Sequence, residues 1–250
     1  MSGHSKWSTI KRKKGALDAK RGKIFSRLAK EITIAVRQGG PDPSGNARLR
    51  TVLIACRNNN MPRENIERAI KRGTGEIEGA AYEEIRYEAY GPGGVGILID
   101  VTTDNKNRTL AEVRHLVTKV GGSLAAANAV AWNFDSRGVI TVPKEGISDD
   151  EILEKAIEAG AEDVDSSGDV HEIYTDPTQL HAVADAFERM GIKAQEIDLK
   201  MIPKTMQKVE GKMAAAVLKL LDALEEHDDV QNVFSNADIS EQDMEAALKE

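Results

Sequence analysis

The chain has 250 residues, which allows one large domain or two to three small ones, and its content of 40% apolar and 30% charged residues is typical of a soluble globular protein. A single cysteine excludes an internal disulfide and fits a reducing cytoplasm, and no apolar run reaches the roughly eighteen residues of a membrane helix. The net charge of −7 is unevenly distributed. The first 73 residues carry 18 Lys and Arg against 5 Asp and Glu, a net of +13, and the remainder carries −20. This asymmetry indicates a polyanionic partner for residues 1–73, the basic segment.

The basic segment predicts an extended N-terminal region followed by three helices. Residues 1–15 are rich in Lys and Arg around Trp7 and show no apolar period. Apolar residues then recur at helical spacing in three stretches, which end at Gly39, near Asn58 and at Gly73. The second and third helices form either a helix-turn-helix for DNA or a plain helical hairpin that follows an RNA surface by shape. The sequence leaves both open.

Beyond a glycine-rich stretch at 74–80, the apolar pattern changes to that of strands. Residues 82–101 predict two strands joined by a Gly-Pro-Gly-Gly turn, and the second strand is apolar almost throughout, as expected for burial on both faces. A helix follows, and Thr109 and Glu112 have the spacing of a capping box at its start. Alternation then predicts a further strand through Val130, Trp132 and Phe134.

Residues 138–203 predict a βαββαβ order, which is ferredoxin-like. Residues 204–237 then supply the helix and strand that 82–137 lacks for a complete two-layer fold. We therefore predict a multidomain α+β protein with an N-terminal helical domain and two two-layer α/β-sandwich (ferredoxin-like) domains, the third inserted into the second. The expected domains are 1–78, 79–137 plus 204–250, and 138–203.

Motifs that suggest catalysis are weak in this chain. Residues Gly91 to Gly96 match G-x-G-x-x-G, but a strand follows where a dinucleotide site needs a helix, so we predict a hairpin turn. Glu112 and His115 have the spacing of metal ligands on one helix face, yet no second Glu-x-x-His pair exists. No P-loop or nucleophile elbow is present. We predict no enzyme activity, no cofactor and no metal.

The strongest functional signal is the surplus of cations on the three basic helices. A solubilising surface normally mixes both signs, but Asp18 is the only acid between Met1 and Lys30. The alternative, in which i,i+4 pairs neutralise the third helix, would join Glu64 to Arg68 and Glu67 to Lys71. If about eight cations neutralise phosphates, log K falls with log salt at a slope of about −7 on duplex DNA. Trp7 either stacks on a base or packs on the helices. The candidate nucleic-acid-binding residues are Lys6, Trp7, Lys11, Arg12, Lys13, Lys14, Lys20, Arg21, Lys23, Arg27, Lys30, Arg48, Arg50, Arg63, Arg68, Lys71 and Arg72.

Several long motifs stand out along the chain: MSGHSKWSTIKRKK at 1–14, RGKIFS at 21–26, GGPDP at 39–43, NARLR at 46–50, MPRENIERAIKRG at 61–73, YEAYGPGG at 87–94 and NRT at 107–109. Together these motifs resemble the YebC family of probable transcriptional regulatory proteins. Two positions depart from the family pattern: Ala89 before the Tyr-Gly-Pro-Gly-Gly turn, and the segment 128–132 that leads into the Trp strand.

The resemblance implies three domains and a cytoplasmic regulator of gene expression without catalytic chemistry. Two mechanisms are attributed to the family: binding of promoter DNA, and action on the ribosome as a translation factor, the role of mitochondrial relatives that activate translation of cytochrome oxidase. An acidic body repels bare nucleic acid, which slightly favours the ribosome. A third class, a small-molecule enzyme, would use the groove between the two predicted α+β domains near Tyr87, Tyr90 and His115. The sequence does not reveal the target sequence, the oligomeric state or an effector.

Overall fold

The computed structural model describes residues 21–248, which form two compact units. One unit contains Leu28–Gly79 and Ser136–Met201, and the other contains Ala80–Asp135 with the described part of Ile202–Glu250. The first turns of the N-terminal helix, 21–27, group with the second unit. Within residues 21–248, no helix is both long enough and apolar enough to cross a membrane.

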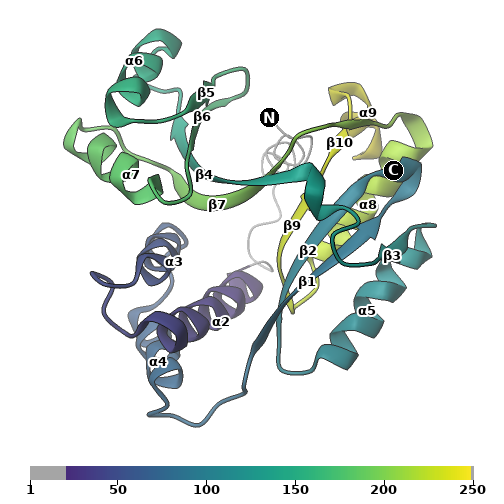
Figure 1. Ribbon diagram of the computed structural model, residues 1–250, viewed down its shortest axis with the longest axis horizontal. Coiled ribbons are helices and arrows are strands. Elements are labelled where there is room, and N and C mark those ends of the chain that lie inside the picture. The colour runs from purple at the N-terminus through teal and green to yellow at the C-terminus, as the bar shows by residue number, and fades with distance from the viewer. Residues whose placement is uncertain (1–20, 249–250) are drawn as a thin grey trace. The chain divides into compact units, whose positions relative to one another are not determined.

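Three helices follow one another in the basic segment: α2 (Arg21–Gly39), α3 (Ala47–Asn58) and α4 (Arg63–Thr74) (Figure 1). Buried Asn46 caps α3, because its side chain accepts the Leu49 N–H and donates to the Ala35 and Gly40 carbonyls. Helix α4 lies against α2 so closely that a Cβ on Gly73 would come within 2.6 Å of Val36 Cβ. This packing directs the opposite face of α4 to solvent.

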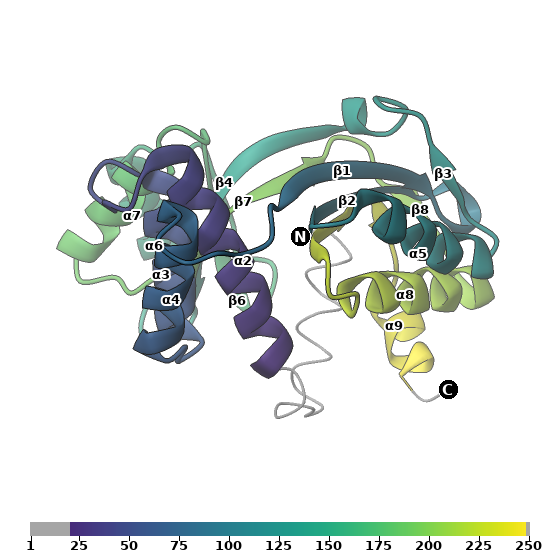
Figure 2. The same cartoon turned by 90° about the horizontal axis from the view of Figure 1, so that it is seen from below.

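The second unit has a four-stranded antiparallel sheet in the order β3-β1-β2-β9. Helices α5 and α8 lie side by side on one face of this sheet (Figure 2), and their apolar residues share one core with β2. Strand β9 joins the sheet only after the ferredoxin-like segment has been completed in the sequence. The elements are β1 (Glu83–Tyr90), η1 (Pro92–Gly94), β2 (Gly96–Thr103), α5 (Lys106–Lys119), β3 (Ser123–Ala125), η2 (Ala131–Asn133), β8 (Gln207–Lys208), α8 (Gly211–Glu225), β9 (Val230–Ser235), β10 (Ala237–Asp238) and α9 (Glu241–Ala247).

The other sheet has the order β5-β6-β4-β7 (Figure 1). Helices α6 and α7 share one hydrophobic core with this sheet. Its chain order βαββαβ and this strand order are those of a ferredoxin-like fold. The α+β fold class predicted from the sequence is confirmed, whereas the domain boundaries stay a prediction. The elements are β4 (Phe134–Pro143), α6 (Asp149–Ala159), β5 (Asp163–Asp165), β6 (Val170–Thr175), α7 (Leu180–Arg189) and β7 (Glu196–Pro203).

Two local predictions were wrong. Helix α5 begins at Lys106 with Asn105 as its N-cap, and the hydroxyl of Thr109 instead donates to the carboxylate of Asp229 inside the fold. Trp132 lies in the 3-10 turn η2, not in a strand, and is 67% exposed. In both places a tertiary hydrogen bond overrides the local pattern. The Gly91–Gly96 motif is a hairpin connection between β1 and β2, as predicted.

Candidate functional sites

The outward face of α4 carries a row of cations without partners. Arg68, Lys71 and Arg72 lie three or four residues apart on one side of the helix and are exposed. In the part of the chain that the structure describes, none of their side chains forms a hydrogen bond or an ion pair, and the same holds for exposed Arg57 at the end of α3. We call Arg68, Lys71 and Arg72 the α4 cation row.

The neutralising pairs considered for this helix are not formed. Glu67 accepts a hydrogen bond from Arg63 at 2.7 Å instead of pairing with Lys71, and Arg68 does not pair with Glu64. Like charges three or four residues apart destabilise a helix by about 0.2–0.5 kcal/mol per pair. Lys71 and Arg72 lie in the last turn of α4, where the helix dipole favours cations and offsets this repulsion.

Other predicted binding residues are occupied within the fold. Arg48 Nε donates to Glu31 at 2.7 Å, and Arg50 donates to the Pro43 and Ser44 carbonyls at 3.3 and 3.1 Å. These arginines tie α3 to its neighbours. They are weaker candidates for phosphate binding than the α4 cation row.

Two cations of α2 contact the end of α8. Lys23 Nζ donates to the Glu226 carbonyl at 2.8 Å, and Arg27 donates to the Glu225 carbonyl and, at 3.3 Å, to that of His227. Burial lowers the pKa of Arg27, against the opposing effect of nearby carboxylates. Lys30 is half-buried on the same helix. The predicted residues Lys6, Trp7, Lys11, Arg12, Lys13, Lys14 and Lys20 lie outside the described residues, as does the side chain of Arg21.

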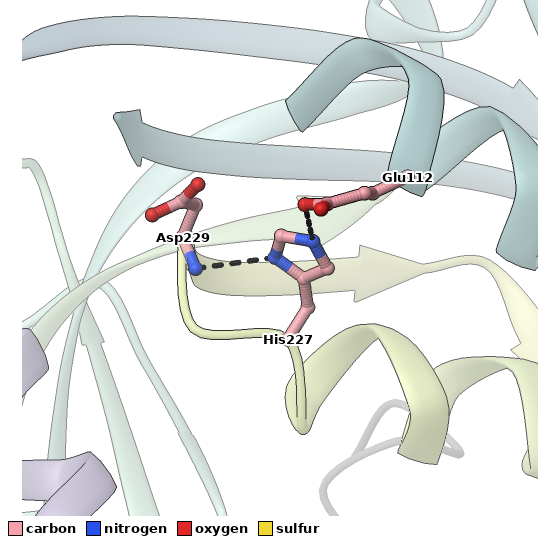
Figure 3. Close-up of side chains that lie close together, drawn as sticks. All are labelled: Glu112, His227 and Asp229. Atoms are coloured by element: carbon pink, nitrogen blue, oxygen red, sulfur yellow. Dashed lines mark hydrogen bonds and ion pairs between the residues drawn. The ribbon is translucent and has the colours of Figure 1, made fainter. Parts of the chain in front are cut away.

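A cluster of titratable groups lies where α5 meets the segment between α8 and β9 (Figure 3). His227 lies between Glu112 and Asp229: its Nε2 is 2.9 Å from Glu112 Oε2, and its Nδ1 is 3.1 Å from the backbone nitrogen of Asp229. Ligand atoms of these three residues lie within 4.8 Å of one another, which is the spacing of a metal site.

Hydrogen bonding in this cluster opposes metal binding. A backbone N–H can only donate, so Nδ1 of His227 accepts and the ring hydrogen is on Nε2, where it bonds to Glu112. A metal needs a ring nitrogen with a free lone pair, and here neither nitrogen has one. The absence of a metal site stays a prediction for the chain as a whole.

Asp229 has a structural role in this cluster. Its buried carboxylate accepts hydrogen bonds from Arg108 at 2.7 Å, Thr109 at 2.8 Å and Thr103 at 3.3 Å.

A cavity of about 800 Å³ adjoins the cluster of Glu112, His227 and Asp229, and His115 lines it. Of the residues considered for an enzyme groove, Tyr87 and Tyr90 are three apart on β1 and therefore face opposite sides of the sheet. They do not form one site with His115.

Comparison with known proteins identifies the family. Residues 5–76 match the model of the TACO1/YebC protein N-terminal domain, and residues 82–237 match that of the TACO1/YebC second and third domain. The chain belongs to the TACO1/YebC family. The resemblance of the N-terminal, Gly-Pro-Gly-Gly and Asn-Arg-Thr motifs to this family is thereby confirmed.

Similar members of the family match over nearly their whole length. A protein of Geobacter sp. (strain M21) is 53% identical over 248 residues, covering 99% of this chain and 100% of the relative. A protein of Desulfotalea psychrophila is 54% identical over 246 residues, or 98% of each chain. Both are named probable transcriptional regulatory proteins. The crystal structure of a conserved hypothetical protein from Aquifex aeolicus, 48% identical, has a TM-score of 0.85 and covers 90% of this chain and 93% of its own.

Sequence reasoning on this TACO1/YebC member missed two features. Glu112 and His227 are 115 residues apart, and no spacing rule joins them. Arg57 was not in the predicted binding set, although it is exposed and without a side-chain partner in the described residues. The feature that could have indicated an exposed side chain is the position of Arg57 one residue before the end of α3.

Proposed function

We propose that the protein is a cytoplasmic regulator of gene expression that binds DNA through its basic N-terminal segment, and that it is not an enzyme. The observation that carries this proposal is the α4 cation row, because three exposed cations on one face have no partner in the described fold. Phosphates of nucleic acid provide such partners and release counterions on binding. The relatives' name, probable transcriptional regulatory protein, supports the same class.

A second candidate is a translation factor that uses the same basic surface on ribosomal RNA. The charge distribution favours it, since the net of −20 beyond residue 73 is repelled by a bare duplex but is attracted to basic protein. A ribosome offers RNA and basic protein together. Sedimentation of a cell lysate at low and high salt separates the candidates: salt-sensitive migration with ribosomes indicates translation, and sequence-selective DNA binding without it indicates transcription.

Reversal of the α4 cation row tests the proposal that both candidates share. In the triple variant Arg68→Glu, Lys71→Glu, Arg72→Glu, we expect affinity for nucleic acid to fall by about two orders of magnitude. The salt slope of log K should become shallower by about 3, because each lost phosphate contact removes about 1 from the slope. Fluorescence anisotropy with labelled duplex DNA and with ribosomal RNA fragments measures both quantities.

A matched control changes the net charge equally outside the basic segment. Lys119, Lys193 and Lys212 are exposed, and reversing all three to Glu should leave the salt slope unchanged. If the two triple variants weaken binding equally, overall charge decides affinity and the α4 cation row is not the binding surface. Circular dichroism of both variants verifies that the helices remain.

A further inference from the structure

Two exposed aromatic side chains of the second unit converge on one backbone atom. Trp132 is 67% exposed and Tyr90 is 41% exposed. The Tyr90 hydroxyl and the Trp132 Nε1–H both donate to the carbonyl oxygen of Ala129, each at 2.9 Å. Since each donor is 2.9 Å from the same oxygen, the two donor atoms lie within 5.8 Å of each other. We call Tyr90 and Trp132 the aromatic pair.

A buried carboxylate fixes the loop that carries Trp132, while Tyr90 lies at the end of β1. Glu88 is 7% exposed and accepts the N–H groups of Asn128 at 2.6 Å, Val130 at 2.6 Å and Ala131 at 2.9 Å. Burial alone would raise the pKa of Glu88, but these three hydrogen bonds and Arg86 outweigh it and hold the pKa below its ordinary value. The loop between β3 and β4 (Figure 1) is therefore anchored to β1 through the side chain of Glu88.

The chain after β7 holds the same loop from another side. Asn133 Nδ2 donates to the Thr205 carbonyl at 2.8 Å, and Thr205 N–H donates back to Asn133 Oδ1 at 3.0 Å. The Lys204 N–H also donates to the Asn133 carbonyl at 2.7 Å. An aromatic side chain held this firmly loses little conformational entropy when a ligand binds, which is the condition of a preorganised contact.

The hydrogen bonds of the aromatic pair limit what it can bind. Both polar donors are already satisfied by Ala129, so neither is available to a peptide carbonyl, and the ring faces are the part left for a ligand. Every nucleobase has a flat face that stacks on an aromatic ring, and such stacking needs no hydrogen-bond donor from the ring. The geometry favours an unpaired base over an extended peptide.

The net negative charge of the segment that contains the aromatic pair is low enough to allow a phosphate group to bind there. Lys204 Nζ donates to the Trp132 carbonyl at 3.2 Å and pairs with Asp135 at 3.0 Å, with its side chain 49% exposed. Residues 80–135 contain seven acidic and five basic residues, a net of only −2 within a segment whose total is −20. Further along the sheet, the carboxylate of Asp100 on β2 is neutralised by Arg86 on β1. A cation beside Trp132 also disfavours an arginine side chain as the stacking partner.

We propose that Trp132 and Tyr90 form a stacking platform for unpaired bases of a single-stranded nucleic acid. This inference rests on the proposed nucleic-acid binding and extends it to a second contact point, outside the basic helices. It assigns single-stranded segments, such as the loops of a folded RNA, as the preferred partner of the second unit.

Fluorescence of Trp132 tests this directly, because the chain has only two tryptophans. In the full-length Trp7→Phe variant, all tryptophan emission comes from Trp132. Titration with a single-stranded oligoadenylate RNA should reduce this emission saturably, whereas a blunt RNA duplex of equal length, with its bases already stacked, should not. In an otherwise wild-type chain, Trp132→Ala should weaken oligoadenylate binding between about fivefold and a hundredfold.

Controls separate this inference from the proposed function. Met213→Ala removes another exposed apolar side chain, 54% exposed, and should leave oligoadenylate affinity unchanged. If anisotropy shows salt-dependent oligoadenylate binding while Trp132 emission and Trp132→Ala affinity do not change, the platform is wrong and the proposed function stands. If no RNA or DNA binds at any salt concentration, both fail. Quenching by a basic peptide but not by oligoadenylate would assign the pair to a protein partner and overturn the proposal.

Discussion

The basic helices and the remainder of the described chain use charge differently. On α4, Arg68, Lys71 and Arg72 project into solvent without a hydrogen bond or ion pair within residues 21–248. In the second unit, Glu88 and Asp229 are buried, and each accepts three hydrogen bonds from the fold through its carboxylate. The comparison shows that these acids hold the structure together, whereas the cations are available to a partner.

This difference separates stability from binding. Removing a buried carboxylate should lower the free energy of unfolding without changing the salt dependence of nucleic-acid binding. Removing an α4 cation should leave the free energy of unfolding nearly unchanged and should weaken the salt dependence of binding.

The largest expected effect on stability is that of Asp229→Ala. The change leaves Arg108, Thr109 and Thr103 without their shared acceptor, and we expect a loss of about 3 kcal/mol in the free energy of unfolding. Urea denaturation measures this, with Asp238→Ala, an exposed aspartate, as the control. A loss no larger than that of the control would show that the carboxylate is not a structural anchor.

Glu88→Gln should cost about 2 kcal/mol, because the amide NH₂ group replaces an acceptor that faces backbone N–H donors. The pKa of Glu88 is lowered in the folded protein, so its stabilisation is complete above the ordinary value of 4.5 and is lost as pH falls through the folded pKa. The difference in unfolding free energy between wild type and variant should therefore be full at pH 7 and vanish in strong acid. A difference that persists unchanged at acid pH would contradict the assignment to the carboxylate.

The smallest expected effect on stability is that of Lys71→Gln. Because the side chain has no partner within residues 21–248, the free energy of unfolding should change by less than about 0.5 kcal/mol. The salt slope of nucleic-acid binding should nevertheless become shallower by about 1. Lys212→Gln, a matched change on α8, should alter neither quantity. A large loss of stability in Lys71→Gln would mean that this lysine belongs to the fold.

The fold was largely predictable from periodicity. The ferredoxin-like order of 138–203 follows from apolar patterns and from signals such as the Ser148–Glu151 capping box, which the structure contains. These signals depend on residues close in sequence. The return of β9 to β2 was inferred from the need to complete a two-layer fold, and the sheet order agrees.

The sites were less predictable because they depend on contacts between distant residues. Trp132 was expected inside a strand from its alternation with Val130 and Phe134, but Glu88 draws the preceding backbone into a turn and leaves the indole exposed. Likewise, no local pattern distinguishes Arg48, which pairs with Glu31, from Arg68, which has no side-chain partner in the described residues. Residue type predicts that a surface is basic, and only the packing shows which of its cations remain available.

The most direct test is the salt dependence of nucleic-acid binding by the full-length chain. Five cations of the basic segment lack a side-chain partner in the described residues: Arg37, Arg57, Arg68, Lys71 and Arg72. If each neutralises one phosphate, log K should fall against log salt with a slope at least as steep as about −4.5 on duplex DNA. Cations of the N-terminal residues would make the slope steeper. A slope near zero, or no binding at low salt to either DNA or ribosomal RNA, would contradict the account.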